Sequence, residues 1–314
     1  MNAKALYQTI ADQLPVFFRP WWLDAVCSGP WDVALSQDEQ GKILAVLPYQ
    51  VERKWSMRLL RTPALTPYLG PFVLAAQGMP DGPDRWELEE EQIAILLEQL
   101  PAAGYIQFPT VPGFNQFLPL LHRGFGNTNR ITYRIDLQQS EDEILSRMQK
   151  RRRRYIRNAE PGLRITEGTP YLQQFFDMHR RTFEKKKQAY RYDPAFLRRL
   201  METTAVHQAS RFWAIVQEDN TPLGMLWVVY DNQCMYQLLS TFSEGGGNPA
   251  AVSLLTWHAI SEAKKMGLAA FDFEGSVEPG IEQFFRKFGG DRHGYLVFEK
   301  TASLVWQLKK TLLG

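Results

Sequence analysis

Residues 271–290 read FDFEGSVEPGIEQFFRKFGG, and they combine an acidic strand end, a glycine turn and a short helix of aromatic and basic residues. The outline of this stretch also occurs earlier in the chain. A shift of 163 positions places five residues on identical partners: Gly104 on Gly267, Phe108 on Phe271, Arg123 on Arg286, Phe125 on Phe288 and Gly126 on Gly289. Self-similarity at one fixed spacing is typical of a duplicated folding unit, so the pattern predicts one unit used twice.

The segments before each copy predict the same order of secondary structure. Apolar runs at 31–35 and 43–51 flank a polar turn in the first half, and runs at 212–216 and 223–230 flank a turn with Asp, Asn and Pro in the second. Two apolar runs around such a turn are typical of a β-hairpin. Both copies of the repeat unit are therefore expected to begin with a hairpin.

A helix is expected next in each half, at residues 88–100 and 250–265. Each run ends shortly before a glycine, Gly104 or Gly267, as expected at or just beyond a helix C-cap. The strand and short helix of the repeated stretch follow. The predicted unit is therefore hairpin, helix, strand and short helix.

Length and composition agree with two such units. At 314 residues, with 45% apolar and 22% charged residues, the chain is long for one core and suits two domains of about 150 residues each. We expect them at residues 1–130 and 131–314. The formal net charge of +2 argues against a generally basic nucleic-acid binder, so DNA is not an expected partner.

Cysteine and hydropathy patterns argue against several other classes. Cys27 and Cys234 stand far apart without Cys or His at metal-ligand spacing, so no metal site is expected. Residues 1–14 carry charges among their apolar residues and lack the apolar core of a secretion signal. No run approaches the roughly 20 apolar residues that span a bilayer. We therefore expect a cytoplasmic protein without a transmembrane segment.

A helix start lies between the two halves. Ser140 and Glu143 form a capping-box pattern after a strand-like alternation at 132–137. The predicted helix continues through the basic run 150–157 and stops near Pro161, which cannot extend it without a broken hydrogen bond.

The basic run has two interpretations. At helical spacing its arginines spread over more than one turn, so they cannot all face one ligand. This favours a solvated face beside an apolar stripe through Met148, Tyr155 and Ile156. A surface for RNA or anionic lipid is the alternative, in which one or two guanidinium groups contact phosphate.

Five stretches together resemble a known family. They are the strand at 133–137 with its capped helix, the helical residues 154–159 and 182–187, the proline-rich segment 63–71 and the stretch 271–290. On these residues the chain resembles the FemAB-like branch of the GNAT acyltransferase superfamily. The resemblance implies an α/β fold with α+β character. It consists of two tandem GNAT-like domains, each with a central mixed β-sheet flanked by helices.

The same resemblance implies an N-acyltransferase or aminoacyltransferase that moves an acyl group directly from a carrier to an amine. An acyl-coenzyme A thioester is the expected co-substrate, charged tRNA is the alternative donor, and no permanently bound cofactor is expected. No heptad stretch matches the long coiled-coil arm of some tRNA-dependent members, which disfavours an arm-dependent enzyme. The expected acceptor is a small-molecule or peptidoglycan-precursor amine.

The loop at 243–249 is the candidate carrier site. Gly245, Gly246 and Gly247 let a ligand approach the backbone closely, and Asn248 before a proline prepares an open helix N-terminus that attracts phosphate. In GNAT enzymes the pyrophosphate of coenzyme A lies at the equivalent loop, although the usual Gln/Arg-x-x-Gly-x-Gly/Ala pattern is absent here. A flexible glycine loop before a capped helix is the alternative.

Glu274 is the candidate catalytic base. Strand alternation puts Asp272 and Glu274 on one face, and Glu274 ends the strand where α/β sheets open toward ligands. We expect Glu274 to accept the proton of the attacking ammonium, directly or through water, or to bind the cationic acceptor, and Asp272 to be structural. Pairing of both with Arg286 or Lys287 is the alternative. Arg286 stands where the family pattern often has lysine, and it is either an anion contact or a surface arginine.

The first copy lacks this acidic equipment. It has Pro109, Thr110 and Val111 at the positions of residues 272–274. We therefore expect the active site in the second domain and a non-catalytic first domain.

Five more residues are candidates. Tyr236 and Ser240 are expected on one face of a strand, where they either protonate the leaving group or line the core. Lys187 and Tyr190 either bind the acceptor, together with Arg154, or belong to a solvated helix end. A backbone N–H of the splayed strand is expected to meet the oxyanion. No Ser or Cys stands in an activated setting, which favours direct transfer.

A non-enzymatic alternative remains. It is an RNA- or nucleotide-binding module built on a decayed transferase pair, with residues 150–157 as its basic surface.

Overall fold

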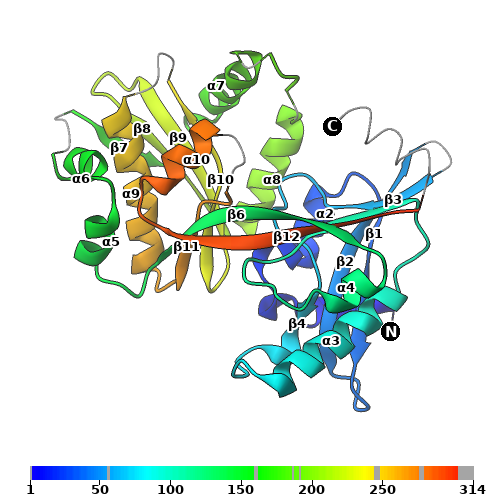
Figure 1. Ribbon diagram of the computed structural model, residues 1–314. Coiled ribbons are helices and arrows are strands. Elements are labelled where there is room, and N and C mark those ends of the chain that lie inside the picture. The colour runs from blue at the N-terminus through cyan, green and yellow to red at the C-terminus, as the bar shows by residue number, and fades with distance from the viewer. Residues whose placement is uncertain are drawn as a thin grey trace. The chain divides into compact units, whose positions relative to one another are not determined.

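The computed structural model describes residues 2–54, 57–158, 162–185, 187–190, 192–243, 248–275 and 279–302. The chain divides into two compact units. One is built from Met1–Arg130 with the chain from Gly294 onward, and the other from Ile131–His293. Two strands, β6 (Gly126–Asp136) and β12 (Asp291–Thr301), run from one unit into the other (Figure 1). No helix in the described ranges is long and apolar enough to cross a bilayer.

The first unit is a mixed sheet with helices. Its strands follow the order β1-β2-β3-β5-β12, in which only β3 and β5 are parallel, and β4 pairs with β2. Helix α3 packs its buried residues Ile93 and Leu96 with Phe108 and Phe298 of the sheet. The elements are α1 (Ala3–Gln8), η1 (Ala11–Gln13), η2 (Val16–Phe18), α2 (Pro20–Val26), β1 (Trp31–Gln37), β2 (Ile43–Lys54), β3 (Met57–Arg61), β4 (Phe72–Val73), η3 (Leu74–Ala76), α3 (Pro83–Glu98), β5 (Tyr105–Pro109) and α4 (Leu118–His122).

The second unit has a sheet of order β6-β11-β10-β9-β8-β7, in which only β10 and β11 are parallel. Its remaining elements are α5 (Glu141–Arg147), α6 (Lys150–Arg157), β7 (Arg164–Glu167), α7 (Leu172–Lys185), α8 (Pro194–Val206), β8 (Ser210–Val216), β9 (Pro222–Tyr230), β10 (Cys234–Phe242), α9 (Pro249–Lys265), β11 (Ala270–Asp272) and α10 (Pro279–Arg286).

The predicted duplication is confirmed by element order and strand pairing. Apart from β4 and η3, which lie between β3 and α3, the series β1, β2, β3, α3, β5, α4 recurs as β8, β9, β10, α9, β11, α10. In each series the third strand is antiparallel to the second and parallel to the strand that follows the helix. The mixed α/β architecture expected from the sequence is therefore present in both units.

Helices cover both faces of the second sheet. The ring of Trp213 on β8 lies 5.1 Å from that of His258 on α9, whereas the ring of the neighbouring Phe212 lies 5.3 Å from that of Phe175 on α7. Successive residues of a strand point to opposite faces. We call these faces the α9 face and the α7 face.

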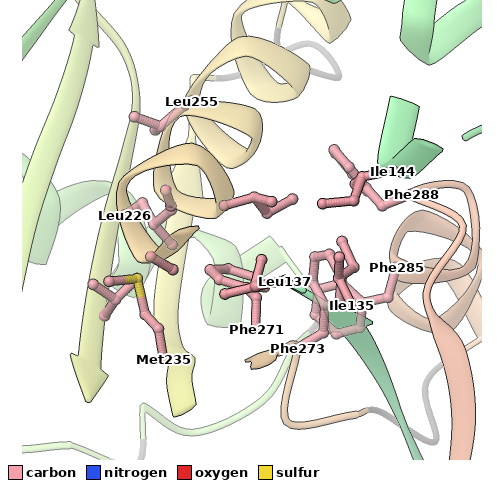
Figure 2. Packing of buried hydrophobic residues seen from close by; sticks show 14 of the residues in the cluster. Ile135, Leu137, Ile144, Leu226, Met235, Leu255, Phe271, Phe273, Phe285 and Phe288 are labelled. Carbon is pink, nitrogen blue, oxygen red and sulfur yellow. The ribbon is translucent and has the colours of Figure 1, made fainter. Parts of the chain in front are cut away.

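The main core of the second unit lies on the α9 face. Figure 2 shows Phe271 and Phe273 gathered with Ile135 and Phe285, and the rings of Phe273 and Phe285 are 5.0 Å apart. Both Phe271 and Phe273 are almost completely buried. Each such side chain contributes about 1.5–3 kcal/mol by leaving water, which fixes the strand that precedes the candidate base.

The helix expected to run unbroken through the basic segment is interrupted, so that prediction is wrong at this point. The capping box of Ser140 and Glu143 starts α5 as predicted, but Met148 and Gln149 have extended backbone and separate α5 from α6. Met148 is buried in the core on the α9 face. The backbone N–H of Gln149 donates to the carbonyl of Lys287 at 3.0 Å, so tertiary contacts override helix continuity.

Candidate functional site

Strands β10 and β11 separate at the edge of the sheet that carries the candidate base. They pair in parallel as far as Tyr236, which lies opposite Asp272. There β11 ends, whereas β10 continues to Phe242. Parallel strands end at the same edge of a sheet, where α/β proteins commonly bind ligands. Glu274 and the chain that follows β10 therefore leave the sheet at one edge.

A buried carboxylate organises this edge from the α7 face. Asp272 is completely buried and forms an ion pair with Arg134, with 2.7 Å between Oδ2 and Nε. Its Oδ1 accepts hydrogen bonds from Thr132 Oγ1 at 2.5 Å and from the backbone N–H of Glu274 at 2.7 Å. A buried charge is tolerated only when it is paired and hydrogen-bonded. The ion-pair partner of Asp272 is thus on β6, and the alternative of a pair with a basic residue of α10 is wrong for Asp272.

The backbone of Glu274 is held in an uncommon conformation. Its φ is 60°, in the left-handed region, and Gly275 follows with φ 70°. A Cβ at position 275 would lie 2.1 Å from the carbonyl oxygen of Ile131, so only glycine fits. A left-handed residue other than glycine costs about 1–2 kcal/mol, and such strain clusters at functional sites. The hydrogen bond to Asp272 holds this turn.

The carboxylate of Glu274 is held in a partly buried environment. The residue is partly exposed, yet its Oε1 is buried and has no hydrogen-bond partner within the ranges that the structure describes. Burial, and then the charge of Asp272, raises the pKa of Glu274 well above its ordinary value of 4.5. Carboxyl groups with raised pKa values are effective proton acceptors near neutral pH, and they concentrate at functional sites.

Tyr236 and Ser240 lie on opposite faces of β10, so the prediction of a shared face is wrong. Three steps along β10 from Tyr236 to Leu239 face two steps along β9. The extra residue is a β-bulge, and it reverses the alternation of side chains. Ser240 lies on the side of Phe242, which packs against the core of the α9 face. Tyr236 lies on the α7 face beside Asp272.

Of the two hydroxyl residues, Tyr236 is the one that lies beside the buried Asp272. Tyr236 on β10 is buried and lies opposite Asp272 on β11, and Asp272 lies opposite Arg134 on β6. The three side chains therefore form one row across the sheet. Burial raises the pKa of Tyr236 well above 10.0, so the phenol keeps its proton and can act as a donor.

Helix α9 begins as predicted. The side-chain oxygen of Asn248 accepts from the N–H groups of Ala250 at 2.9 Å and Ala251 at 3.2 Å, and Pro249 is the first helical residue. The first turn carries no acidic side chain, so nothing in that turn offsets the partial positive charge of the helix end. The predicted carrier residues Gly245, Gly246 and Gly247 lie outside the described residues.

Arg152 contacts the start of α9 through Pro249 and Ser253. Its Nη1 donates to Ser253 Oγ at 2.8 Å, and its guanidinium carbon lies 4.7 Å from the centroid of the Phe284 ring on α10. Arg154 is exposed, with its guanidinium 6.0 Å from the ring centroid of Tyr155. Arg152 therefore joins α6, α9 and α10, whereas Arg154 faces solvent.

Arg286 is exposed on α10. Its Nε lies 3.7 Å from Oε1 of Glu282, one turn earlier. Glu282 in turn accepts a hydrogen bond from the hydroxyl of Tyr133. The same hydroxyl accepts a hydrogen bond from Nη2 of Arg292 at 3.3 Å. These contacts attach α10 to β6 and β12 within the second unit and leave Arg286 at the surface.

The two other acceptor candidates follow the end of α7. Lys187 is exposed and has a left-handed φ of 52°. The hydroxyl of Tyr190 lies 3.2 Å from Nδ1 of His179. The imidazole of His179 is stacked on the ring of Phe175, and burial lowers the pKa of His179 to about 4. Tyr190 is thus held by a buried aromatic cluster, while the side chain of Lys187 is exposed to solvent.

Three residues of this edge were missed by sequence reasoning: Thr132, Arg134 and Arg152. Thr132 and Arg134 alternate with the buried Tyr133 and Ile135, so the sequence did indicate a second, polar face. It did not indicate which strand lies beside that face.

Comparisons with known proteins agree with this geometry. Residues 144–286 match the family model described as an acetyltransferase (GNAT) domain. The crystal structure of FemX matches 100% of this chain over 98% of its own length, with a TM-score of 0.72 and 13% sequence identity. The chain has the fold of FemX, and its residues 144–286 are similar to a GNAT domain. The resemblance to the FemAB-like branch of the GNAT superfamily is confirmed at the level of the fold.

Two further solved structures share this fold. The C-terminal domain (DUF2156) of a putative lysylphosphatidylglycerol synthetase from Agrobacterium fabrum has a TM-score of 0.60 and 13% identity, covering 98% of this chain and 95% of that one. L-PGS from Bacillus licheniformis has a TM-score of 0.50 and 12% identity, covering 89% and 88%. No curated protein sequence matches the chain. The match to the GNAT domain model supports an acyltransferase type of function, and the solved structures show the fold.

Proposed function

We propose that the second unit transfers an acyl group from a coenzyme A thioester directly to an amine. The observation that carries this proposal is the buried Oε1 of Glu274, which lacks a partner among the described residues and lies just beyond the point where β10 and β11 separate. Both strands and Glu274 fall inside the GNAT match at residues 144–286. The first unit, without acidic residues at 109–111, is proposed to be non-catalytic.

The proposed chemistry uses three groups of this unit. The amine nitrogen forms a bond to the thioester carbonyl carbon, and Glu274 takes the proton that the nitrogen loses. Backbone N–H groups of β10 beyond Tyr236 stabilise the oxyanion. The carbon–sulfur bond then breaks, and the thiolate takes a proton from Tyr236. Because Ser240 lies on the opposite face, it has no part in this step.

The carrier is proposed to bind at the start of α9. The open first turn, capped by Asn248, offers N–H groups and a partial positive charge to a pyrophosphate. The segment with Gly245, Gly246 and Gly247 precedes it directly in the chain. Arg152 adds a cation beside the same turn, and the surface residue Arg286 is a further candidate for anion contact.

The acceptor is proposed to be a small-molecule or peptidoglycan-precursor amine, in line with the FemX-like fold. The exposed Lys187 and Arg154 and the half-buried Tyr190 remain the candidates to bind it. We propose a cytoplasmic location, where coenzyme A thioesters and such precursors are both available. Charged tRNA is the alternative donor.

The rival RNA-binding function is less well supported by the contacts of α6. Arg151 Nε donates to the hydroxyl of Tyr155 at 2.6 Å, and Arg153 Nη1 donates to the carbonyl of Ser146 at 2.8 Å. Arg152 is engaged with α9 and α10. These three guanidinium groups serve contacts within the protein, which agrees with a structural role for much of the basic run.

Thermal unfolding in the presence of candidate donors tests the proposal. A ligand at about 100 times its Kd stabilises the folded state by about 2.7 kcal/mol, which raises the Tm of a domain of this size by roughly 5–10 °C. We expect acetyl-coenzyme A or a longer acyl-coenzyme A to produce this shift, with thiol release on addition of an amine. No shift with any acyl-coenzyme A, together with salt-sensitive RNA binding that is lost on replacing the α6 arginines, would favour the rival function.

A further inference from the structure

We infer that the acyl group transferred by the second unit carries a hydroxyl, which Gln237 recognises. Gln237 is the first residue of β10 beyond Tyr236, where the pairing with β11 stops. It therefore lies at the point where the two strands begin to separate, next to the residue that is proposed to protonate the thiolate. This assignment rests on the proposed acyl transfer and names the class of its acyl group.

The side chain of Gln237 lies on the α9 face. Residues 237 and 238 form the bulge in β10 and face Val228 of β9, which belongs to the core on the α9 face. Nε2 of Gln237 lies 3.5 Å from Oγ of Ser240, which is on the same face. Ala251, close to the start of α9, packs into this core as well. Gln237 and Ser240 thus lie on the side from which the proposed carrier arrives.

The amide oxygen of Gln237 is a buried hydrogen-bond acceptor that the fold leaves unused. Only 5% of Gln237 is exposed, and its Oε1 has no hydrogen-bond partner within the described ranges. The contact of its Nε2 with Ser240, at 3.5 Å, is long for a hydrogen bond. A buried polar atom without a partner is unfavourable, and in a native protein it calls for an explanation. A hydrogen-bond donor on the ligand supplies the missing partner.

The part of the ligand that meets Gln237 is the acyl group. The carrier is proposed to bind at the start of α9, which follows the end of β10 at Phe242 in the chain. Its arm then runs back along β10, and its acyl end reaches the point where β10 and β11 separate. Glu274 is the other buried acceptor without a described partner at this point, and its proposed proton comes from the amine. Gln237 therefore serves the acyl group.

The chemistry of Gln237 and Ser240 favours a hydroxyl. The Gln237 amide is uncharged and lies beside an apolar core, where burial of an ammonium costs far more than burial of a hydroxyl. This argues against an aminoacyl group. Through one oxygen, a hydroxyl can donate to Oε1 of Gln237 and accept from Oγ of Ser240, whereas an amide N–H can only donate. The acyl group is therefore of the hydroxyacyl class rather than a plain alkanoyl group.

Calorimetric titration of the full-length protein with matched pairs of acyl-coenzyme A thioesters tests this inference. 3-Hydroxybutyryl-coenzyme A is compared with butyryl-coenzyme A, and lactoyl-coenzyme A with propionyl-coenzyme A, because the members of each pair differ by one hydroxyl. We expect the hydroxylated member of at least one pair to bind about tenfold more tightly, because a plain acyl group leaves the buried oxygen of Gln237 unpaired.

Substitutions of Gln237 assign the preference to this side chain. Gln237→Leu, or Gln237→Met if the first variant does not fold, should bring the two Kd values of the pair within about twofold of each other. A purely structural role of Gln237 would change both Kd values together and leave their ratio unchanged. Gln217→Leu is the matched control, because Gln217 is exposed just after β8 in the same unit, and it should keep the preference.

The possible results separate this inference from the proposed function. Equal Kd values within both pairs for the unmodified protein, or a preference that survives in the Gln237 variants, would overturn the hydroxyacyl assignment and leave the acyl transfer intact. Absence of binding by all four thioesters would overturn the acyl transfer from coenzyme A and the assignment with it.

Discussion

Replacing Asp272 with Asn tests whether its buried carboxylate organises the edge that carries Glu274. The change keeps the shape of the side chain and removes its charge, so Arg134, with 24% of its side chain exposed, loses its counter-ion. Loss of one partner of a buried ion pair costs about 3–5 kcal/mol. Because Arg134 retains some contact with water, we expect the lower end, about 3 kcal/mol, which lowers the Tm by roughly 6–12 °C.

The hydrogen bonds of Asp272 also predict that Asp272→Asn destabilises the protein. Both oxygens of Asp272 accept bonds, one from Arg134 and one from Thr132 and Glu274. An Asn amide must turn its NH₂ group toward one of these donors, which leaves a buried donor unsatisfied. The loss is therefore not confined to the charge.

Thermal unfolding followed by circular dichroism measures the effect, with Asp291→Asn as the matched control. Asp291 pairs with Arg147 in the same unit, but half of its side chain is exposed, and exposed pairs contribute about 0–1 kcal/mol. We expect a much larger fall in Tm for Asp272→Asn than for the control. Equal falls for the two variants would refute the role given to Asp272.

Three further substitutions have defined outcomes. Gly275→Ala should destabilise the protein by about 2 kcal/mol or more, because the added Cβ would lie 2.1 Å from a strand carbonyl oxygen at a residue whose φ is 70°. The control Gly280→Ala, where nothing lies within 4 Å of the added Cβ, should be neutral or stabilising in thermal unfolding. Equal effects of the two substitutions would contradict the strain at Gly275. His179 has a folded pKa of about 4, below its unfolded value of 6.5, so its contribution is present above pH 6.5 and is lost by roughly 3 kcal/mol as the pH falls to about 4. In urea unfolding at these two pH values, the free energy of unfolding of His179→Phe should fall by about that amount less than that of the unmodified protein. An equal fall in both proteins would refute the depressed pKa of His179. Arg152→Ala should cost about 1–2 kcal/mol through its hydrogen bonds and its contact with an aromatic ring, and Arg154→Ala close to zero, so reversed effects on Tm would contradict the assignment.

The fold was predictable because its signals are local and occur twice. Turn residues between apolar runs marked the hairpins, and Gly267, which directly follows the C-cap Met266, marked the end of α9. Gly104 was a poorer marker, because α3 already ends at Glu98 with Gln99 as its C-cap. The break between α5 and α6 was not predictable, because nothing in the local sequence stops a helix at Met148. That break depends on burial of Met148 and on a backbone hydrogen bond to Lys287, far along the chain.

The candidate site was predictable only in part, for a similar reason. Glu274 stood out because the strand, the acidic residue and the glycine are adjacent in sequence. Its supports, Thr132 and Arg134, come from a strand about 140 positions earlier, and only the pairing of β6 with β11 brings them together. The bulge in β10, which separates Tyr236 from Ser240, likewise depends on the register with β9.

Arg152 and Arg154 show how much of an arginine's environment helical spacing predicts. Tyr155 and Ile156 lie three and four positions after Arg152, so Arg152 shares the apolar stripe that faces the core. The stripe was visible in the sequence, but it does not say that α9 and α10 lie against it. Spacing therefore separates the inward arginine from the outward ones and leaves its partners to the tertiary structure.

The pH dependence of acyl transfer by the unmodified protein and by Glu274→Gln tests the central claim most directly. Because the base must be deprotonated, we expect kcat/KM of the unmodified protein to rise with pH through the raised pKa of Glu274. Glu274→Gln should lower kcat/KM by about 10²–10⁴-fold and abolish that rise, while acyl-coenzyme A still raises its Tm. Full turnover by Glu274→Gln at every pH would contradict the account.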